Sequence, residues 1–367
     1  PRAPAAKAQP AANPPASAAP AQPAPAAEKP AQQPAPAAAQ PAPAAAQPAQ
    51  QPAPAAAAGS KTRMNFGSSS PGSSFYVYSV AVAKFWNTQA PEVEATSVAT
   101  GGCLENIRRM ETGELQAGLA CPDLTFRAMN GLEEFKDKPL TKQRVLWIFG
   151  VGAQGFFTGK DTGLKTWKDL DGKDFIAGMK GSSTEQQGKA VLDVLGIKPK
   201  LRSGGVEEMI QSYVSKQIVG FVKLQPGPRA GDAGTLEAHT ARPVNLLGMS
   251  AEDEAKIKER YPWYAAFVDV EPNGLSNGLP DQKVRTVGLV NAIGVVSDTP
   301  EDLAYKLTKL SVEDKVEQAT AYPAVKGIDF VKLTFEQSLT PLHAGAYRYY
   351  REIGQQIPDK LKPPEMK

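Results

Sequence analysis

Serine and glycine residues gather in one stretch near the start of the folded part of the chain, residues 65–86 (NFGSSSPGSSFYVYSVAVAKFW). The loop GSSSPGSS separates an apolar run from a segment in which Tyr78, Val82 and Phe85 recur at helical spacing. Such a loop places serine hydroxyls and backbone N–H groups at the positive end of a helix, where an anion can bind. It lacks the spacing of a nucleotide-binding fingerprint. It therefore predicts a small-carboxylate site; the alternative is an ordinary serine-capped turn.

Strands and helices alternate from Lys61 onward, which predicts an α/β fold with a largely parallel sheet. In such sheets ligands bind at the carboxyl ends of the strands. Four polar loops that contain glycine follow predicted strands, at residues 67–74, 100–102, 181–184 and 225–231. If two lobes face each other, all four loops can line one cleft.

Hydroxyls at helix starts can hold a carboxylate without a titratable group, because charge-assisted hydrogen bonds contribute about 1.5–3 kcal/mol each. Arg229 is the fixed cation of the fourth loop and can clamp a carboxylate with two hydrogen bonds; the alternative is an exposed arginine. Gln225 can orient an amide or a second carboxylate. Tyr76 or Phe75 can form a pocket wall or pack in the core. The hydroxyl candidates, each with helix capping as its alternative, are Ser69, Ser70, Ser74, Ser182, Ser183 and Thr184.

The first 60 residues differ from the rest of the chain. They hold 16 of the 33 prolines, no aromatic residue and only four charged residues. Alanine, proline and glutamine fill a drifting PAPAAAQ repeat, which offers too little apolar surface to offset its ordering entropy. The segment 1–60 is therefore predicted to be a disordered, polyproline-like tether.

The rest of the chain is long for one hydrophobic core, so two lobes are expected. The predicted first lobe comprises residues 61–165 and 284–340, the second lobe 166–283, and a C-terminal helix 341–358. The net charge of +3 comes without a basic stripe, so nucleic-acid binding has no electrostatic support. No run of about 18 apolar residues indicates a membrane-spanning helix.

Cys103 and Cys121 are the two cysteines of the sequence. Their spacing does not show whether they meet, so a disulfide and two small buried thiols both stay open, the thiols being preferred. The chain begins at Pro1, and a Pro/Ala spacer ahead of a folded body fits an exported protein whose signal peptide has been removed. A cytosolic protein with a linker to another domain is the alternative.

Breaker and capping residues predict several local elements. Residues 145–151 and 155–159 are predicted to be two separate strands. Thr299 is expected to cap a helix that has Pro300 in its first turn. Ser182 or Ser183 is expected to cap another helix, with Glu185 or Gln186 completing a capping box.

The sequence contains no motif that indicates catalysis. His239 and His343 are the two histidines, and no Ser/His/Asp order or clustered metal ligands accompany them. Asp169 and Asp171 are explained as turn residues. We therefore expect no enzymatic activity, no cofactor and no metal.

Taken together, the motifs resemble those of the TAXI-type solute receptors of tripartite ATP-independent periplasmic (TRAP) transporters. The matching order and spacing run from about residue 64 to 354. The terminal segment and the TGG…EN segment are the most specific. The segments are GSSSPGSSFY, TGGCLENIRRMETGE, LACPD, KTWKDLDGK followed by KGSST, TPEDLAYKLTK and LHAGAYRYYREIG.

This resemblance implies a two-lobed, type II-like periplasmic binding protein fold. It also implies capture of a small solute, often glutamate or another dicarboxylate, and delivery to a permease driven by an ion gradient. Ser183 departs from a common family glycine, and Cys121-Pro122 from a polar pair, so the usual ligand does not transfer. The positions carried over are Gly67, Ser69, Ser70, Ser74, Tyr76, Thr100, Gly101, Gly102, Asn106, Gly181, Ser182 and Thr184.

The sequence therefore predicts a monomeric extracytoplasmic receptor whose N-terminal tether can anchor it to a membrane. Its predicted partners are a small carboxylate and the permease subunits of a TRAP transporter. A ligand-sensing adaptor of the same fold and, less favoured, an enzyme on this scaffold are the alternatives. If the receptor prediction holds, Ser69 and Ser183 should face one cleft.

Overall fold

The computed structural model describes residues 61–264, 266–314 and 316–366, so the predicted tether lies outside the described residues. Helices and strands alternate over most of this range, as the sequence predicts. The strands are β1 (Thr62–Gly67), β2 (Val93–Val98), β3 (Ala117–Ala120), β4 (Gln143–Gly159), β5 (Asp174–Ile176), β6 (Lys200–Arg202), β7 (Gly220–Gln225), β8 (Val244–Leu246), β9 (Phe267–Val270) and β10 (Val284–Val296).

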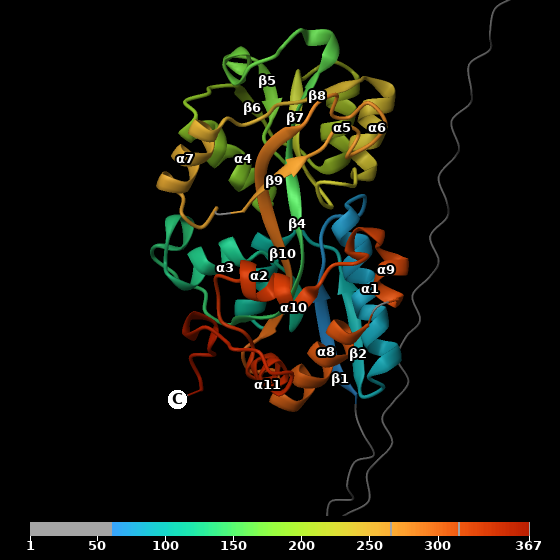
Figure 1. Ribbon diagram of the computed structural model, residues 1–367, viewed down its shortest axis with the longest axis vertical. Helices are drawn as coiled ribbons and strands as arrows, with labels where there is room; N and C mark the ends of the chain where they lie inside the picture. The colour runs from blue at the N-terminus through green and yellow to red at the C-terminus, as the bar shows by residue number, and fades with distance from the viewer. Residues whose placement is uncertain (1–60, 265, 315, 367) are drawn as a thin grey trace, which may run out of the picture. The chain divides into compact units, whose positions relative to one another are not determined.

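The helices lie on both sides of these strands (Figure 1). Five of the helical segments are short 3₁₀ turns, η1 (Glu133–Phe135), η2 (Lys160–Thr162), η3 (Trp167–Leu170), η4 (Pro323–Val325) and η5 (Asp359–Leu361). The α-helices are α1 (Ser74–Gln89), α2 (Cys103–Glu111), α3 (Pro122–Met129), α4 (Ser183–Val194), α5 (Val206–Val214), α6 (Ala233–Ala241), α7 (Ala251–Arg260), α8 (Glu301–Glu313), α9 (Glu317–Ala321), α10 (Phe330–Gln337) and α11 (Ala344–Glu352).

The strands form one mixed sheet in the order β2-β1-β3-β10-β4-β7-β5-β6. β1 pairs in parallel with β2 and β3, and β5 pairs in parallel with β6 and β7. In the middle, β10 and β4 run antiparallel to each other and to β3 and β7. The parallel pairing expected from the sequence is thus found only at the two ends of the sheet. The long strands β4 and β10 join these ends, and they pair with their neighbours in antiparallel orientation.

β4 corrects the prediction of two strands over the same residues. It runs unbroken through Gly150 and Gly152, and β10 pairs with it from Gln143 to Ala153. A Cβ atom on Gly152 would lie 2.7 Å from the carbonyl oxygen of Gln225. The glycine there permits a close approach of the neighbouring strand and does not end β4.

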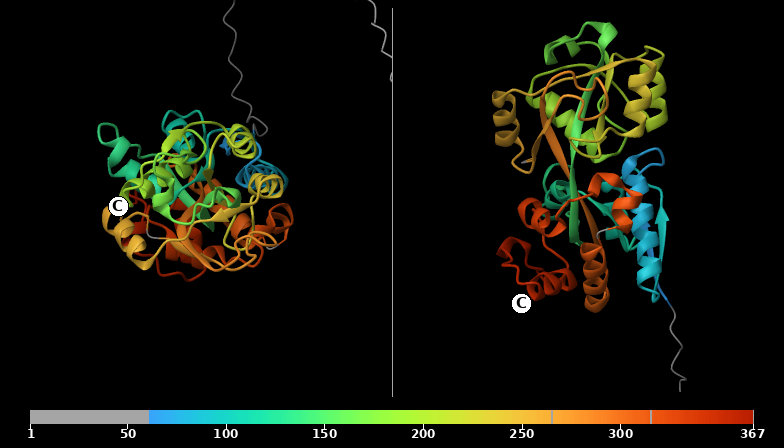
Figure 2. Two further views of the ribbon diagram at one scale, coloured as in Figure 1. Left: turned by 90° about the horizontal axis from the view of Figure 1, so that it is seen from above. Right: turned by 45° about the vertical axis from the view of Figure 1, so that its right-hand side comes forward.

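The buried apolar residues divide into cores at the two ends of β4 and β10. One core holds β1–β3, α1–α3 and the C-terminal helices, and we call this end the first lobe. Two further clusters pack β5, β7–β9 and α4–α7, and we call this end, which also carries β6, the second lobe. In β4, residues up to Phe149 pack in the first-lobe core and residues from Ala153 pack in the second-lobe core. In β10, residues up to Val287 pack in the second-lobe core and residues from Leu289 pack in the first-lobe core. Both strands therefore cross from one lobe to the other (Figures 1 and 2), and the predicted two-lobed α/β fold is confirmed.

Capping explains the start of α1 but not that of α8. α1 begins after Ser73, whose hydroxyl accepts a hydrogen bond from the Phe75 N–H, and it buries the predicted stripe of Tyr78, Val82 and Phe85. α8 begins after Pro300 with no side-chain cap, so Thr299 does not cap it as expected. Among the described residues, no helix is both long and apolar enough to cross a membrane.

Candidate functional site

Three of the four predicted loops meet at a pocket between the two lobes. The space between the lining atoms there is about 550 Å³, a volume that includes open solvent. The first lobe contributes Ser69, Gly101 and Gly102, and the second lobe contributes Ser182, Ser183 and Thr184. Ser69 and Ser183 therefore line the same pocket.

Four helices begin at this pocket. Ser73, Gly102, Cys121 and Ser182 are the N-cap residues of α1, α2, α3 and α4, and each of them lines the pocket. Helix starts carry unsatisfied N–H donors and a partial positive charge of about half an elementary charge. In α2 and α3 no side chain caps the first turn. The pocket is thus surrounded by groups that attract an anion.

Ser182 and Ser183 lie side by side but have different roles. The Ser182 hydroxyl donates to the Met179 carbonyl at 2.6 Å and accepts from the Glu185 N–H at 3.1 Å, so it is fully used as the helix cap. The Glu185 carboxylate accepts from the N–H of Gly181 at 2.6 Å, one residue before the position that a capping box requires. The Ser183 side chain is 4% exposed, and its hydroxyl has no hydrogen-bond partner among the described residues. A buried, unpaired hydroxyl in a pocket wall is available to a ligand.

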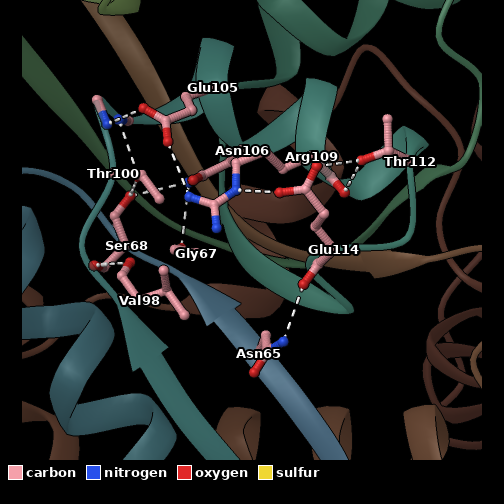
Figure 3. Close-up of polar contacts among 12 residues, drawn as sticks. Asn65, Gly67, Ser68, Val98, Thr100, Glu105, Asn106, Arg109, Thr112 and Glu114 are labelled. Carbon is pink, nitrogen blue, oxygen red and sulfur yellow. Dashed lines mark hydrogen bonds and ion pairs between the residues drawn. The ribbon is translucent and has the colours of Figure 1, made fainter.

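The second loop is held by hydrogen bonds to the end of β1 (Figure 3). The Thr100 hydroxyl donates to the Ser68 carbonyl at 2.9 Å, and the Asn106 amide donates to the carbonyls of Gly67 and Ser68 at 3.2 and 2.9 Å. Thr100 and Asn106 therefore position the loop. Gly102 has a φ angle of +100°, which requires glycine, and a Cβ atom there would lie 3.9 Å from the Ser69 hydroxyl.

A disulfide joins Cys103 to Cys121, with their Cα atoms 5.8 Å apart. The preference for two free thiols is thus wrong: spacing in the sequence gave no measure of this distance. Cys103 is the first residue of α2 and Cys121 is the N-cap of α3, and both line the pocket. The bridge therefore fixes two uncapped helix starts next to each other.

Lys223 is a pocket residue that the sequence reasoning missed. Its ammonium lies 2.7 Å from the Asp232 carboxylate, and both side chains are buried, 7% and 0% exposed. Asp232 also caps α6 and accepts hydrogen bonds from the Ser74 N–H at 3.2 Å and the Ser74 hydroxyl at 2.9 Å. The available signal was a lysine at a position inside the otherwise apolar strand GFVKLQ.

Other predicted residues lie outside the pocket lining. Ser74 bonds to Asp232 and so connects the lobes. The Gln225 amide bonds to the Lys223 carbonyl and to Thr235, which fixes its own loop within the second lobe. Arg229 is exposed, so its loop supplies no cation to the pocket. Also outside the lining are Ser70, Tyr76, Thr100 and Gly181.

Apolar side chains complete the pocket walls. Phe75, and not Tyr76, forms part of the first-lobe wall, together with Leu119 and Leu289. Met209 belongs to the second-lobe wall, and Leu224 of β7 packs with the first-lobe core. The polar groups are thus set into a largely hydrophobic cavity, as is typical of small-molecule sites.

Both histidines have structural contacts. His239 Nδ1 accepts from the Val244 N–H, and His343 Nδ1 accepts from the Gly345 N–H as the N-cap of α11. Burial lowers the pKa of each imidazole. Among the described residues, no group of three His, Cys, Asp or Glu side chains is arranged to hold a metal ion.

The fold and the site together define the class: a two-lobed α/β protein with a pocket between the lobes. The chain belongs to the NMT1-like family, whose family model matches residues 66–354.

Solved structures similar to this chain include three with low sequence identity. The alkanesulfonate-binding protein SsuA from Xanthomonas axonopodis pv. citri, bound to MOPS, is 15% identical, with 80% of this chain and 92% of that chain covered and a TM-score of 0.43. An ancestral arginine-binding protein bound to arginine is 16% identical, with coverage of 72% and 98% and a TM-score of 0.42. A TctC solute binding protein from Polaromonas is 13% identical, with coverage of 80% and 98% and a TM-score of 0.43.

Proposed function

We propose that the chain is an extracytoplasmic solute-binding receptor that captures a small carboxylate between its lobes and has no catalytic role. The observation that carries this proposal is the pocket at which four helices begin, with the buried and unpaired Ser183 hydroxyl in its wall. Four or five hydrogen bonds to a carboxylate, offset by the costs of association, support micromolar binding.

Two features support the proposed location and partner. The Cys103–Cys121 disulfide fits an oxidising compartment outside the cytoplasm. The sequence resemblance to TAXI-type receptors supports delivery of the solute to the permease of a TRAP transporter. In this proposal the tether of residues 1–60 can keep the receptor near the membrane while the lobes close on the solute.

Titration calorimetry and thermal unfolding with a panel of small carboxylates, sulfonates and amino acids test this function. A solute present at 100 times its Kd should stabilise the folded protein by about 2.7 kcal/mol. The Ser183→Ala variant should bind the same solute about tenfold more weakly. Folded protein that shows no saturable binding to any member of the panel contradicts the proposal.

A further inference from the structure

The charge of the pocket is balanced before a ligand enters. Among the described residues that line it, Lys223 is the only one with a charged side chain. The Lys223 ammonium is already paired with Asp232 at 2.7 Å, and Asp232 has no exposed surface. Lys223 therefore does not offer an uncompensated positive charge to a ligand.

The remaining attraction for an anion comes from the helix starts. α2 and α3 have no side-chain cap, and the Cys103–Cys121 bridge holds their first residues together. Each of these helix ends carries about half a positive charge. The first turn of α2 also holds Glu105, which is paired with Arg109, and the first turn of α3 holds the buried Asp123. Ser183 adds a buried hydroxyl that has no other partner. This set of groups matches one carboxylate.

The apolar part of the wall cannot hold a second charged group. The side chains there include Phe75, Leu119, Val206, Met209 and Leu224. An ionised group that is buried against such side chains without a partner loses its hydration with no compensation. The guanidinium expected at Arg229 is exposed and outside the lining.

We propose that the ligand is a monocarboxylate with an apolar, aliphatic body, and not a dicarboxylate or a zwitterionic amino acid. This inference rests on the proposed function and narrows it. The carboxylate binds at the starts of α2 and α3 near Ser183, and the aliphatic body lies against the apolar wall.

Calorimetry with two matched series tests the inference: butanoate, pentanoate and hexanoate against succinate, glutarate and adipate. Affinity should rise by up to about fourfold for each methylene that the apolar wall buries. Hexanoate should bind at least tenfold more tightly than adipate, L-glutamate or the neutral hexanamide. Tighter binding of a dicarboxylate or of glutamate overturns this inference and leaves the proposed receptor function standing. If hexanamide binds as tightly as hexanoate, the carboxylate does not contribute to ligand recognition, and the inference is wrong.

Two variants test separately the group proposed to bind the carboxylate and the wall proposed to contact the aliphatic body. Ser183→Ala should weaken hexanoate about tenfold, whereas Ser203→Ala, at an exposed serine of the same lobe, should not change it. Val206→Thr keeps the shape of a half-buried wall residue and should lower the affinity for hexanoate more than that for butanoate. If Val206→Thr weakens both acids equally, the aliphatic body does not lie on this wall. If no solute of any class binds, the proposed function fails together with this inference.

Discussion

Two neighbouring serines illustrate how residue type alone does not assign a binding role. Ser69 is buried and lines the pocket, whereas Ser70 is partly exposed and donates to the Pro71 carbonyl at 3.2 Å. Ser69→Ala should lower the affinity for the best-binding carboxylate about tenfold, because a hydrogen bond to a charged group is lost. Ser70→Ala should leave the affinity unchanged. Calorimetry on both variants checks this; equal losses would show that the whole loop, and not Ser69, contacts the solute.

Asp123 should make the stability of the protein depend on pH. Burial raises the pKa of its carboxyl to about 6, and the positive charge of Arg127 opposes this in part. Because the folded state holds this proton more tightly than the unfolded state, the stability contributed by Asp123 falls as pH rises from about 4 to about 6 and then stays low. The difference between a pKa of about 6 and the ordinary aspartate value corresponds to roughly 3 kcal/mol.

The Asp123→Asn variant isolates this effect from the other carboxylates. It should be more stable than the wild-type chain at pH 7, by up to about 3 kcal/mol, and the difference should shrink toward pH 4. Urea unfolding of both proteins between pH 4 and pH 7 measures the difference. A difference that does not vary with pH would mean that the Asp123 carboxyl titrates normally.

At the residue scale, the sequence predicted more of the hydroxyl side chains that line the pocket than of its charged side chains. Ser69, Ser182, Ser183 and Thr184 line the pocket, and loops of small residues before helices have a recognisable pattern. Ser70 and Ser74, predicted from the same pattern, lie outside the lining. Lys223 was missed because its partner Asp232 lies beyond the following turn, and only the folded chain brings the two together. A lysine inside an apolar strand indicates a buried partner, but it does not say which one.

At the element scale, the starts of α2 and α3 are arranged around the disulfide. Neither helix has a side-chain cap, and the bridge takes the place of such caps in fixing the two first turns. The two cysteines are separated by 18 residues, and closing a loop of about this length stabilises a fold by about 3 kcal/mol.

Reduction of the bridge should therefore weaken both folding and binding. The Cys103→Ser/Cys121→Ser variant should lose about 3 kcal/mol of unfolding free energy and bind the carboxylate more weakly, because its helix starts are no longer held together. Urea unfolding and calorimetry with and without dithiothreitol measure both effects. The double variant should be insensitive to the reductant; a wild-type chain that is equally insensitive would contradict the structural role of the bridge.

Strand β4 shows where prediction of elements from the sequence reached its limit. Glycines divide residues 145–159 into two apolar runs, and glycine is as common at turns as at close approaches between strands. The folded chain decides between these meanings, because Gly152 faces the backbone of Gln225. By contrast, α1 was predicted well because apolar spacing and a serine-containing loop agree there.

At the scale of the whole molecule, two sets of contacts bridge the lobes on either side of the crossing strands. On one side, Ser74 of the first lobe binds Asp232 of the second lobe through its N–H and its hydroxyl. On the other, the Gln186 side chain accepts from Arg127 at 3.1 Å and donates to Glu134 at 2.7 Å. β4 and β10 connect the lobes near Gly152 and Gly288, where we place the hinge of closure in the proposed receptor.

Removing one of these bridging contacts should favour the open form. Ser74→Ala deletes the hydroxyl bond to the Asp232 carboxylate but keeps the backbone bond and the Lys223–Asp232 ion pair. A hydrogen bond to a charged group contributes about 1.5–3 kcal/mol, so closure becomes less favourable by a part of that amount. Since the solute binds the closed form in this proposal, its apparent affinity should fall up to about tenfold.

Small-angle X-ray scattering of the ligand-free protein provides the direct measurement. The Ser74→Ala variant should have a larger radius of gyration than the wild-type chain, and a saturating solute should return both to the same value. Ser203→Ala, at an exposed serine, serves as the control and should scatter as the wild-type chain does. The tether of residues 1–60 must be removed equally from all the proteins, so that only the lobes determine the difference. If the Ser74→Ala variant and the wild-type chain have the same radius of gyration, the Ser74–Asp232 hydrogen bond does not stabilise the closed form. It then only orients the Asp232 side chain that caps α6.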